Sequence, residues 1–391
     1  MGKVLCVIDH FGSGGAQRQM VELACGLRAL GHEVQAFVYF PQHDFFRERL
    51  DAAGIRVHAA SKGRGFSPGL VRELAHLLRA EQPDAVISFL DRPNAYAVLA
   101  RAWAATPAKL VVSERSHHQS VPSAWATWLR LRLLRRADAV VANSETHAQW
   151  LRVRLPRSTV VHCIYNGFDL DQFEAPPLVP QRPQDVRLLA IGRIGPEKNA
   201  LAIVQAMAQF QARHGYVPSL SWVGRDDESA AGVAYRRRVD DALAAAPQVR
   251  QRWQWLGERR DVPTLLREHH ALVHASFFEG LPNAVCEALA SGRPALLSDR
   301  CDHPRLVKPE ERGFLFDPDN ASSLLQALES LLALPASGWH AMGAAARRYA
   351  VDNLSSARMV HEFERLLLPE QGAERHPPPR PASAEAPIAN R

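Results

Sequence analysis

The sequence predicts an α/β protein built from two tandem domains, each with a parallel sheet covered by helices on both faces. Short apolar runs alternate with amphipathic stretches in both halves of the chain, which is typical of doubly wound parallel sheets. A proline-rich segment separates the halves. The length of 391 residues, 47% of them hydrophobic, suits two cores of ordinary size better than one.

We expect the first domain to span residues 1–173. Apolar runs of strand length alternate here with stretches whose apolar residues recur at helical spacing, including those at 14–31 and 70–83. The expected strands are 4–9, 33–40, 84–90, 109–114 and 137–144. The segment EAPPLVPQRPQD (174–185) contains four prolines and no periodicity, so we interpret it as the linker.

The same alternation resumes after the linker, so we expect a second domain over 186–350. Its expected strands are 186–193, 218–224, 270–276 and 293–299, and its expected helices are 199–213, 283–292 and 321–333. A last helix is expected within 351–368. The segment 369–391 is rich in proline and poor in apolar residues, which predicts a disordered tail.

Composition excludes several classes of protein. The five cysteines are scattered without a C-x-x-C pair, which is typical of reduced thiols in a cytoplasmic protein. No apolar run reaches the roughly 18 residues of a membrane-spanning helix. The short apolar start, VLCVID, leads into a glycine loop and is interpreted as a first strand, not a signal peptide. The net charge of +6 is modest.

The most informative segment is FFEGLPNAVCEALASGRPAL (277–296). It places Glu279 after a strand and Glu287 inside the helix that follows, with a turn through Leu281 between them. The backbone N–H groups of Asn283 and Ala284 begin that helix. A helix N-terminus offers unpaired donors and partial positive charge, which suits a diphosphate, and carboxylates suit sugar and ribose hydroxyls.

Two cations follow the first strand of the second domain, in AIGRIGPEKN (190–199). Arg193 and Lys198 lie at a strand-to-helix turn, where fixed positive charges can neutralise a leaving diphosphate. A third segment, FGSGGAQRQ (11–19), is a glycine loop between the first strand and the first helix. Its spacing does not fit G-x-G-x-x-G, and the second strand ends without the acid of a dinucleotide-binding domain.

Together these segments resemble glycosyltransferase family 4 over nearly the whole chain, through its E-x7-E, G-R-x-x-x-x-K and G-G-A-x-R motifs. The resemblance implies the GT-B fold: two Rossmann-like domains, a cleft between them and a C-terminal helix that crosses back. It implies that Glu279 faces the transferred sugar and Glu287 the nucleotide ribose, while Arg193 and Lys198 clamp the diphosphate. It also implies that Gly14 and Gly15 approach the donor phosphates from the first domain.

The resemblance further implies transfer of a hexose or N-acetylhexosamine from a nucleotide diphosphate sugar, with retention of configuration. A UDP-sugar is the favoured donor, and no cofactor or metal is expected. The family often places a histidine near the donor sugar. Here His117 and His118 both follow a strand, and we favour His118. The pairs Asp169–Asp171 and Asp317–Asp319 resemble metal-binding triplets, but their contexts favour turn residues.

A basic stretch with tryptophans, WATWLRLRLLRR (125–136), gives the main indication about the acceptor. Such a helix can lie in the interface of an anionic membrane, or its leucines can pack on the sheet. The first interpretation predicts a polyprenyl-diphosphate-linked glycan as acceptor and a peripheral location on the cytoplasmic face of the membrane. A free glycan acceptor stays open, and no nucleic-acid partner is expected.

Two other functions remain compatible with the sequence. A nucleotide-sugar 2-epimerase would share the architecture, although the two motifs of the second domain favour transfer. A non-catalytic sugar-nucleotide-binding protein is the other alternative, and the presence of all four charged motif residues argues against it.

Overall fold

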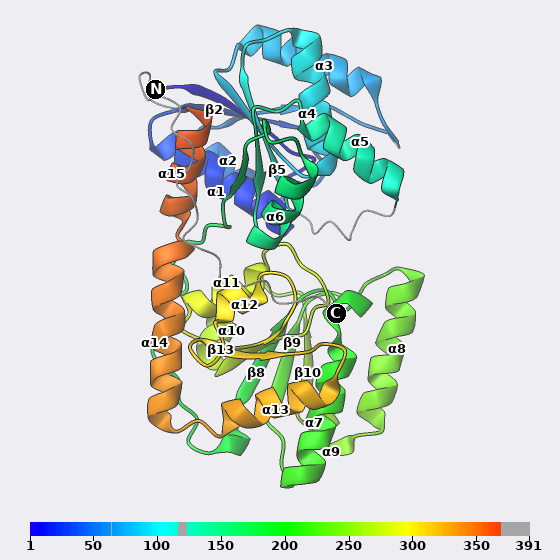
Figure 1. Ribbon diagram of the computed structural model, residues 1–391, viewed down its shortest axis with the longest axis vertical. Coiled ribbons are helices and arrows are strands. Elements are labelled where there is room, and N and C mark those ends of the chain that lie inside the picture. Colours follow the sequence, from blue (N-terminus) through cyan, green and yellow to red (C-terminus); the bar gives the residue numbers. More distant parts are fainter. Residues whose placement is uncertain (64, 116–122, 369–391) are drawn as a thin grey trace.

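The computed structural model describes residues 1–63, 65–115 and 123–368. Within these ranges the chain forms two parallel sheets, one in each half (Figure 1). The first comprises β1 (Lys3–Val7), β2 (Glu33–Val38), β3 (Arg56–Ala59), β4 (Ala85–Phe89), β5 (Lys109–Glu114), β6 (Ala139–Ala142) and β7 (Val161–Cys163), and the second β8 (Arg187–Ile191), β9 (Ser219–Val223), β10 (Trp253–Gly257), β11 (Ala271–His274), β12 (Ala295–Ser298) and β13 (Gly313–Phe316).

Helices connect the strands and cover both sheets. Those before the second sheet are α1 (Gly15–Ala29), α2 (Arg47–Ala52), α3 (Pro68–Glu81), α4 (Asp91–Ala104), α5 (Ala124–Leu134) and α6 (Glu145–Arg154). Those that follow are α7 (Ala200–His214), α8 (Ala230–Ala244), α9 (Pro247–Gln251), α10 (Val262–Glu268), α11 (Asn283–Ala290), α12 (His303–Val307), α13 (Ala321–Leu332), α14 (Ala336–Asn353) and α15 (Ser356–Leu367). The fold is therefore the expected pair of α/β domains.

Both sheets are doubly wound. The strand order is β3-β2-β1-β4-β5-β6-β7 in the first and β10-β9-β8-β11-β12-β13 in the second. In each sheet the order reverses beside the first strand, between β1 and β4 or between β8 and β11. Ligands of such folds bind outside the carboxyl ends of the strands at this reversal. The loops that follow β1 and β8 carry the predicted glycine loop and the predicted cations.

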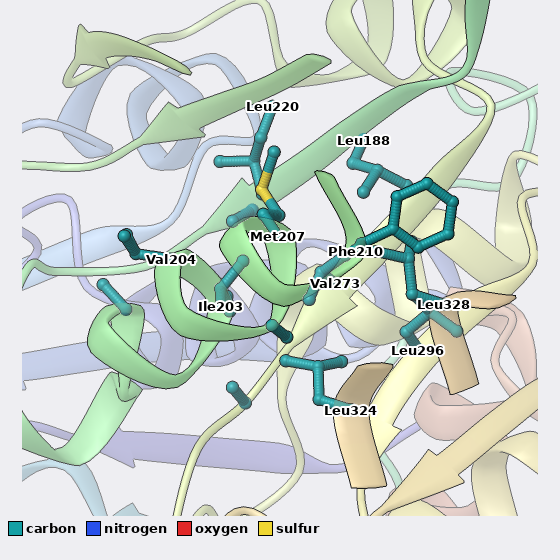
Figure 2. Close-up of a cluster of buried hydrophobic side chains, with 14 of the residues drawn as sticks. Leu188, Ile203, Val204, Met207, Phe210, Leu220, Val273, Leu296, Leu324 and Leu328 are labelled. Carbon is teal, nitrogen blue, oxygen red and sulfur yellow. The ribbon is translucent and has the colours of Figure 1, made fainter. Parts of the chain in front are cut away.

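The core of the second domain shows why these elements form. Helix α7 buries an apolar stripe that includes Ile203, Met207 and Phe210, spaced three or four residues apart. This stripe packs on the face of the sheet made by Leu188, Leu220, Val273 and Leu296, with Leu324 and Leu328 of α13 beside it (Figure 2). Helices α11 and α14 cover the opposite face of the sheet. Both faces are therefore buried, and the strands carry apolar residues on both.

The chain passes between the domains at two neighbouring places. Phe168 N donates to Leu354 O at 2.9 Å, and Ser356 N donates to Phe168 O at 2.9 Å, so the two crossings are hydrogen-bonded to each other. Beyond the second crossing, α15 packs on α1 of the first domain, whereas α14 packs on α11 of the second. Figure 1 shows the two helices stacked along one side of the molecule.

The segment 174–185 does not itself bridge the domains. The chain has already crossed at Phe168, which is buried with Phe173 in a core cluster of the second domain. The buried guanidinium of Arg293 then donates to Pro176 O at 3.0 Å and so fixes the segment to the second domain. A 3₁₀ turn, Pro183–Asp185, leads into β8. The tail expected at 369–391 lies outside the described residues.

Candidate active site

A cleft of about 820 Å³ lies between the domains, at the carboxyl ends of β1, β8, β9 and β11. Of the predicted site residues, it is lined by Gly14, Gly15, Arg193, Lys198, Glu279, Leu281, Asn283 and Ala284. A smaller hollow of about 520 Å³, around Gln82 and Ala105, lies near the amino ends of β4 and β5 and contains none of them. The fold therefore gathers three motifs that are far apart in the sequence into one cavity.

Lys198 and Glu279 form the charged centre of the cleft. Lys198 closes a 3₁₀ turn, Pro196–Lys198, after β8, and its Nζ pairs with Glu279 Oε1. His274, the last residue of β11, places Nε2 at 3.1 Å from the same oxygen. Ser276 Oγ lies 3.1 Å from that His274 nitrogen. One carboxylate oxygen is thus held by a cation and an imidazole.

The electrostatics of this cluster favour an ionised carboxylate. Burial alone would raise the pKa of Glu279, but the Lys198 charge and the His274 hydrogen bond outweigh it and hold the pKa well below its usual range. Burial lowers the pKa of His274, with the Lys198 charge acting in the same direction. At neutral pH the centre is therefore a carboxylate held between an ammonium group and a neutral imidazole.

Arg193 lies nearer the rim of the cleft. Its side chain is 49% exposed, and its Nη2 donates to Glu197 Oε1 at 2.7 Å. The pair joins the start of the β8–α7 loop to the 3₁₀ turn that carries Lys198. Because the guanidinium is half exposed, it can still reach a ligand in the cleft through its other N–H groups.

The turn before α11 brings backbone donors to the cleft wall. Helix α11 begins at Asn283 after Pro282, whose fixed φ suits a helix entry, and no side chain caps it. The turn also touches the first domain: a Cβ added to Gly280 would lie 2.7 Å from Arg115 O. Only glycine allows the two backbones to approach this closely.

The first domain faces this turn with its glycine loop. Gly14 precedes α1 in extended conformation, and its N–H donates to Gly12 O at 2.9 Å. A Cβ on Gly15 would lie 2.8 Å from Asn283 Nδ2. The missing side chain of Gly15 therefore leaves the Asn283 amide open to the cavity.

Glu287 is not among the residues that line the cleft. It lies on α11 with a side chain 7% exposed, and its Oε1 accepts from Arg18 Nη1 of α1 at 2.6 Å. Burial raises the pKa of Glu287, against the Arg18 charge. The predicted ribose contact would thus involve a carboxylate that already pairs across the domains. His117 and His118 lie outside the described residues.

Sequence reasoning missed several residues of this site. His10, His43 and Gln17 line the cleft from the first domain, and His274 lies at its charged centre. His274 ends a strand next to the E-x7-E segment, a position that could have identified it. Arg18 is the last residue of the G-G-A-x-R motif, but its partner 269 positions away left no signal in the chain.

The two aspartate pairs have local partners. Asp171 N donates to Asp169 Oδ1 at 3.3 Å, and Asp319 N donates to Asp317 Oδ1 at 3.1 Å. Arg300 also pairs with Asp317 and Asp319. Both pairs therefore serve as turn residues. In the described part of the chain, no group of three or more His, Cys, Asp or Glu residues is arranged to hold a metal ion.

The stretch 125–136 has both exposed and buried side chains. Arg130 of α5 is buried and pairs with Glu114 and Asp91, so this arginine does not belong to the exposed basic surface expected for the stretch. Trp125 (68%) and Trp128 (52%) are exposed on the opposite side of the helix. Among the described residues, no helix combines the length and apolar character needed to cross a bilayer.

Comparison with known proteins agrees with this geometry. The family model described as Glycosyltransferase Family 4 matches residues 13–172, and the model described as Glycosyl transferases group 1 matches residues 185–333. The chain is also similar to the crystal structure of Anabaena Alr3699/HepE in complex with UDP and glucose. That likeness has a TM-score of 0.79 at 18% identity, covers 94% of this chain and 99% of that one, and concerns the fold.

Two curated relatives act on undecaprenol-linked sugars, according to their names. One is the UDP-Gal:alpha-D-GlcNAc-diphosphoundecaprenol alpha-1,3-galactosyltransferase of Escherichia coli, 28% identical over 179 residues, or 43% of this chain and 44% of that relative. The other is the N-acetylgalactosamine-N,N'-diacetylbacillosaminyl-diphospho-undecaprenol 4-alpha-N-acetylgalactosaminyltransferase of Campylobacter jejuni, 24% identical over 85% of this chain and 90% of that one. With matching models in both halves and the GT-B architecture, the chain belongs to glycosyltransferase family 4.

Proposed function

We propose that this glycosyltransferase transfers a hexose or N-acetylhexosamine from a UDP-sugar to a lipid-linked glycan, with retention of anomeric configuration. The observation that carries the proposal is the pairing of Lys198 with Glu279 beside the N-terminus of α11, inside the interdomain cleft. Cations and helix N–H groups suit a diphosphate, and a carboxylate suits sugar hydroxyls. The donor complex named for the structural neighbour supports uridine as the base.

In this proposal the second domain binds the leaving group. Lys198, Arg193 and the N–H groups of Asn283 and Ala284 stabilise the negative charge that develops on the diphosphate as the bond to the sugar breaks. Glu279 accepts hydrogen bonds from the sugar, and the neutral His274 holds the carboxylate in place. The donor displaces Glu279 from part of its contact with Lys198, since both compete for the same ammonium group.

Retention follows in the proposal from departure and attack on the same face of the sugar. The bond between the anomeric carbon and the diphosphate oxygen breaks through an oxocarbenium-like state, and the acceptor oxygen forms the new bond. The acceptor proton passes to the departing diphosphate oxygen. The first domain then has to position the acceptor, and among its described residues His10, Gln17, His43 and the glycine loop line the cleft.

The lipid-linked acceptor is supported by the relatives' names and by the surface of α5. Trp125, Trp128 and Leu129 are exposed on one side of this helix, with Arg132 one turn further on, its Cζ 5.0 Å from the Trp128 ring. Aromatic rings with neighbouring cations bind the interface of anionic membranes. Arg130 anchors the opposite side of α5 within the protein. The proposal therefore places the enzyme peripherally on the cytoplasmic face of a membrane.

The test is a turnover screen with the purified chain. UDP-, GDP- and ADP-linked hexoses and N-acetylhexosamines are incubated with undecaprenyl-diphosphate-linked sugars, with and without chelator, and product anomers are assigned by NMR. The proposal expects one UDP-sugar to give an α-linked product in the presence of chelator. Inverted product, transfer only from a non-uridine donor, or epimerised nucleotide sugar without acceptor would overturn it. Binding without any turnover would favour the non-catalytic alternative.

A further inference from the structure

Three polar side chains form a continuous hydrogen-bonded chain from the interior of the first domain to the cleft. Arg115 follows β5 and donates from Nη1 to Asn166 Oδ1 at 2.7 Å. Asn166 lies at the crossing between the domains and donates from Nδ2 to Asn283 Oδ1 at 2.6 Å. Asn283 is the first residue of α11 and lines the cleft.

The chemistry of a guanidinium sets the direction of this chain. An arginine side chain has only N–H donors, so the Asn166 atom facing Arg115 has to be the oxygen. The Asn166 atom facing Asn283 is then the amide nitrogen, which can only donate. Asn283 must accept with Oδ1, and its Nδ2 is left pointing elsewhere. Orientation of both amides therefore follows from hydrogen-bond chemistry.

The Arg115 side chain is buried against an aromatic ring. Its side chain is 8% exposed, and its Cζ lies 3.7 Å from the centre of the Phe89 ring. Within the described part of the chain it makes no ion pair with a carboxylate, and its Nε and Nη2 make no hydrogen bond. Burial lowers the pKa of Arg115 to about 9, which leaves it protonated at neutral pH. A buried cation without a carboxylate partner lowers the stability of the fold. We therefore expect the one hydrogen bond that it makes, to Asn166, to have a function.

Asn283 is the last of the three hydrogen-bonded side chains, and its amide nitrogen, Nδ2, has no hydrogen-bond partner among the described residues. It lies 2.8 Å from the position that a Cβ on Gly15 would take. It shares the cleft with Lys198 and with the open N–H groups of α11. An N–H₂ group aimed into a cavity beside an ammonium group matches the oxygens of a diphosphate.

We propose that Arg115 and Asn166 are positioning residues that fix the polarity of the Asn283 amide, so that its Nδ2 donates to the diphosphate of the nucleotide. This inference rests on the proposed function. Arg115 and Asn166 never touch the donor; they act through Asn283. Since Arg115 belongs to the first domain and Asn283 to the second, the arrangement also makes donor binding depend on the closed contact between the domains.

The decisive variant is Asn166→Asp. A carboxylate at this position still accepts from Arg115, and the fold gains a buried counter-ion, but it cannot donate to Asn283. The Asn283 amide then has to rotate by half a turn, so that Nδ2 donates to the new carboxylate and Oδ1 faces the cleft. A carbonyl oxygen there repels a diphosphate, so we expect UDP affinity, measured by calorimetry, to fall at least about ten-fold.

Two controls separate this effect from a general one. Uridine lacks the diphosphate, so its affinity should be unchanged by Asn166→Asp. In an Asn283→Ala background there is no amide to rotate, so Asn166→Asp should change UDP affinity by less than about two-fold. If the loss is the same in both backgrounds, the new charge acts at long range and the proposal is wrong. Unchanged UDP affinity in the single variant would overturn it equally.

The proposal and the function on which it rests fail differently. If UDP, GDP and ADP all fail to bind the wild-type chain, the donor site itself is wrong. If UDP binds the wild type and the Asn283→Ala variant equally well, the donor site stands and the polarity argument fails. Arg115→Gln provides a second check, because a glutamine can donate or accept. It should lower UDP affinity less than Asn166→Asp does, with uridine affinity again unchanged.

Discussion

The two walls of the cleft differ in charge. Among the described residues, every Lys, Arg, Asp and Glu that lines the cavity comes from the second domain: Arg193, Lys198, Arg225, Glu258, Arg259 and Glu279. The first domain contributes glycines, Ser13, Gln17 and two histidines. The two domains share one architecture, so the difference lies in the loops after the strands. It supports the proposal that the second domain binds a charged donor, while the first domain faces a neutral part of the acceptor.

The largest expected effect comes from removing the carboxylate at the charged centre. Glu279→Gln removes the partner that neutralises Lys198, so UDP should bind several-fold more tightly. Transfer should nevertheless slow about 100-fold, because the sugar loses a charged contact. Both are measured on the purified variant, by calorimetry and by steady-state turnover. Glu258→Gln is the matched control, since Glu258 also lines the cleft. Equal changes in both variants would remove the special role of Glu279.

Buried histidines should make the second domain sensitive to acid. Burial lowers the pKa of His270 to about 4 and of His303 to about 3, both in the second domain. The unfolded chain binds protons below about pH 6.5 that these residues do not bind when folded. Stability should therefore fall as the pH drops from 6.5 towards 4. Intrinsic fluorescence should report it, since Trp222 and Trp253 are buried in this domain.

The histidine contribution can be isolated by substitution. His303→Asn keeps a polar group near Ser298, whose Oγ lies 2.9 Å from His303 Nδ1, but removes the titrating ring. The loss of unfolding free energy between pH 6.5 and 4.5 should shrink by about 2 kcal/mol. Parallel curves for the variant and the wild type would mean that other groups govern the acid response.

A side chain at Gly280 should disrupt the contact between the two domains beside the cleft. A Cβ at this position would lie 2.7 Å from Arg115 O, and neither backbone can move without separating the domains locally. Gly280→Ala should lower kcat/KM about ten-fold, with both UDP affinity and transfer affected. Gly257→Ala is a matched control within the same domain, because a Cβ there meets nothing within 4 Å, although its φ of +67° adds some strain. A normal kcat/KM for Gly280→Ala would show that the close approach is dispensable.

The smallest effect concerns the outer surface of the first domain. Replacing Trp125 and Trp128 together with serine should weaken binding to vesicles that contain phosphatidylglycerol by about five- to ten-fold. UDP affinity should be unchanged. Trp103→Ser is the matched control, since Trp103 is 54% exposed on α4. Equal vesicle binding by all three proteins, measured by sedimentation, would show that α5 is not the membrane surface.

The central strands were predictable from the sequence, but the edge strands were not. All strands expected from apolar runs are found, and the four that were not expected, β3, β7, β10 and β13, are the outer strands of the two sheets. A central parallel strand is buried on both faces and gives a continuous apolar run. An edge strand is partly solvated, as in Arg56–Ala59, where each residue is exposed or half-buried. Its polar residues hide the strand pattern.

The residues of the site could be predicted where they lie within a sequence motif, but not where they depend on contacts between distant segments. The segments around Lys198 and Glu279 indicated residues that line the cleft, because together they resemble two family 4 motifs in the expected order. The Arg18 contact with Glu287 joins residues 269 positions apart, and the Arg115–Asn166 hydrogen bond joins residues 51 positions apart, so neither could be predicted from the sequence. The burial of Arg130 could not be predicted, because helical periodicity does not reveal which residues of an amphipathic helix find buried partners.

Calorimetric titration of UDP and uridine shows whether the second domain binds the donor through its diphosphate. Lys198→Ala should lower UDP affinity at least about 30-fold and leave uridine affinity unchanged. Lys308→Ala, at an exposed lysine of the same domain, should change neither. If UDP binds the Lys198→Ala variant as tightly as it binds the wild type, Lys198 does not bind the diphosphate and the account of the cleft is wrong.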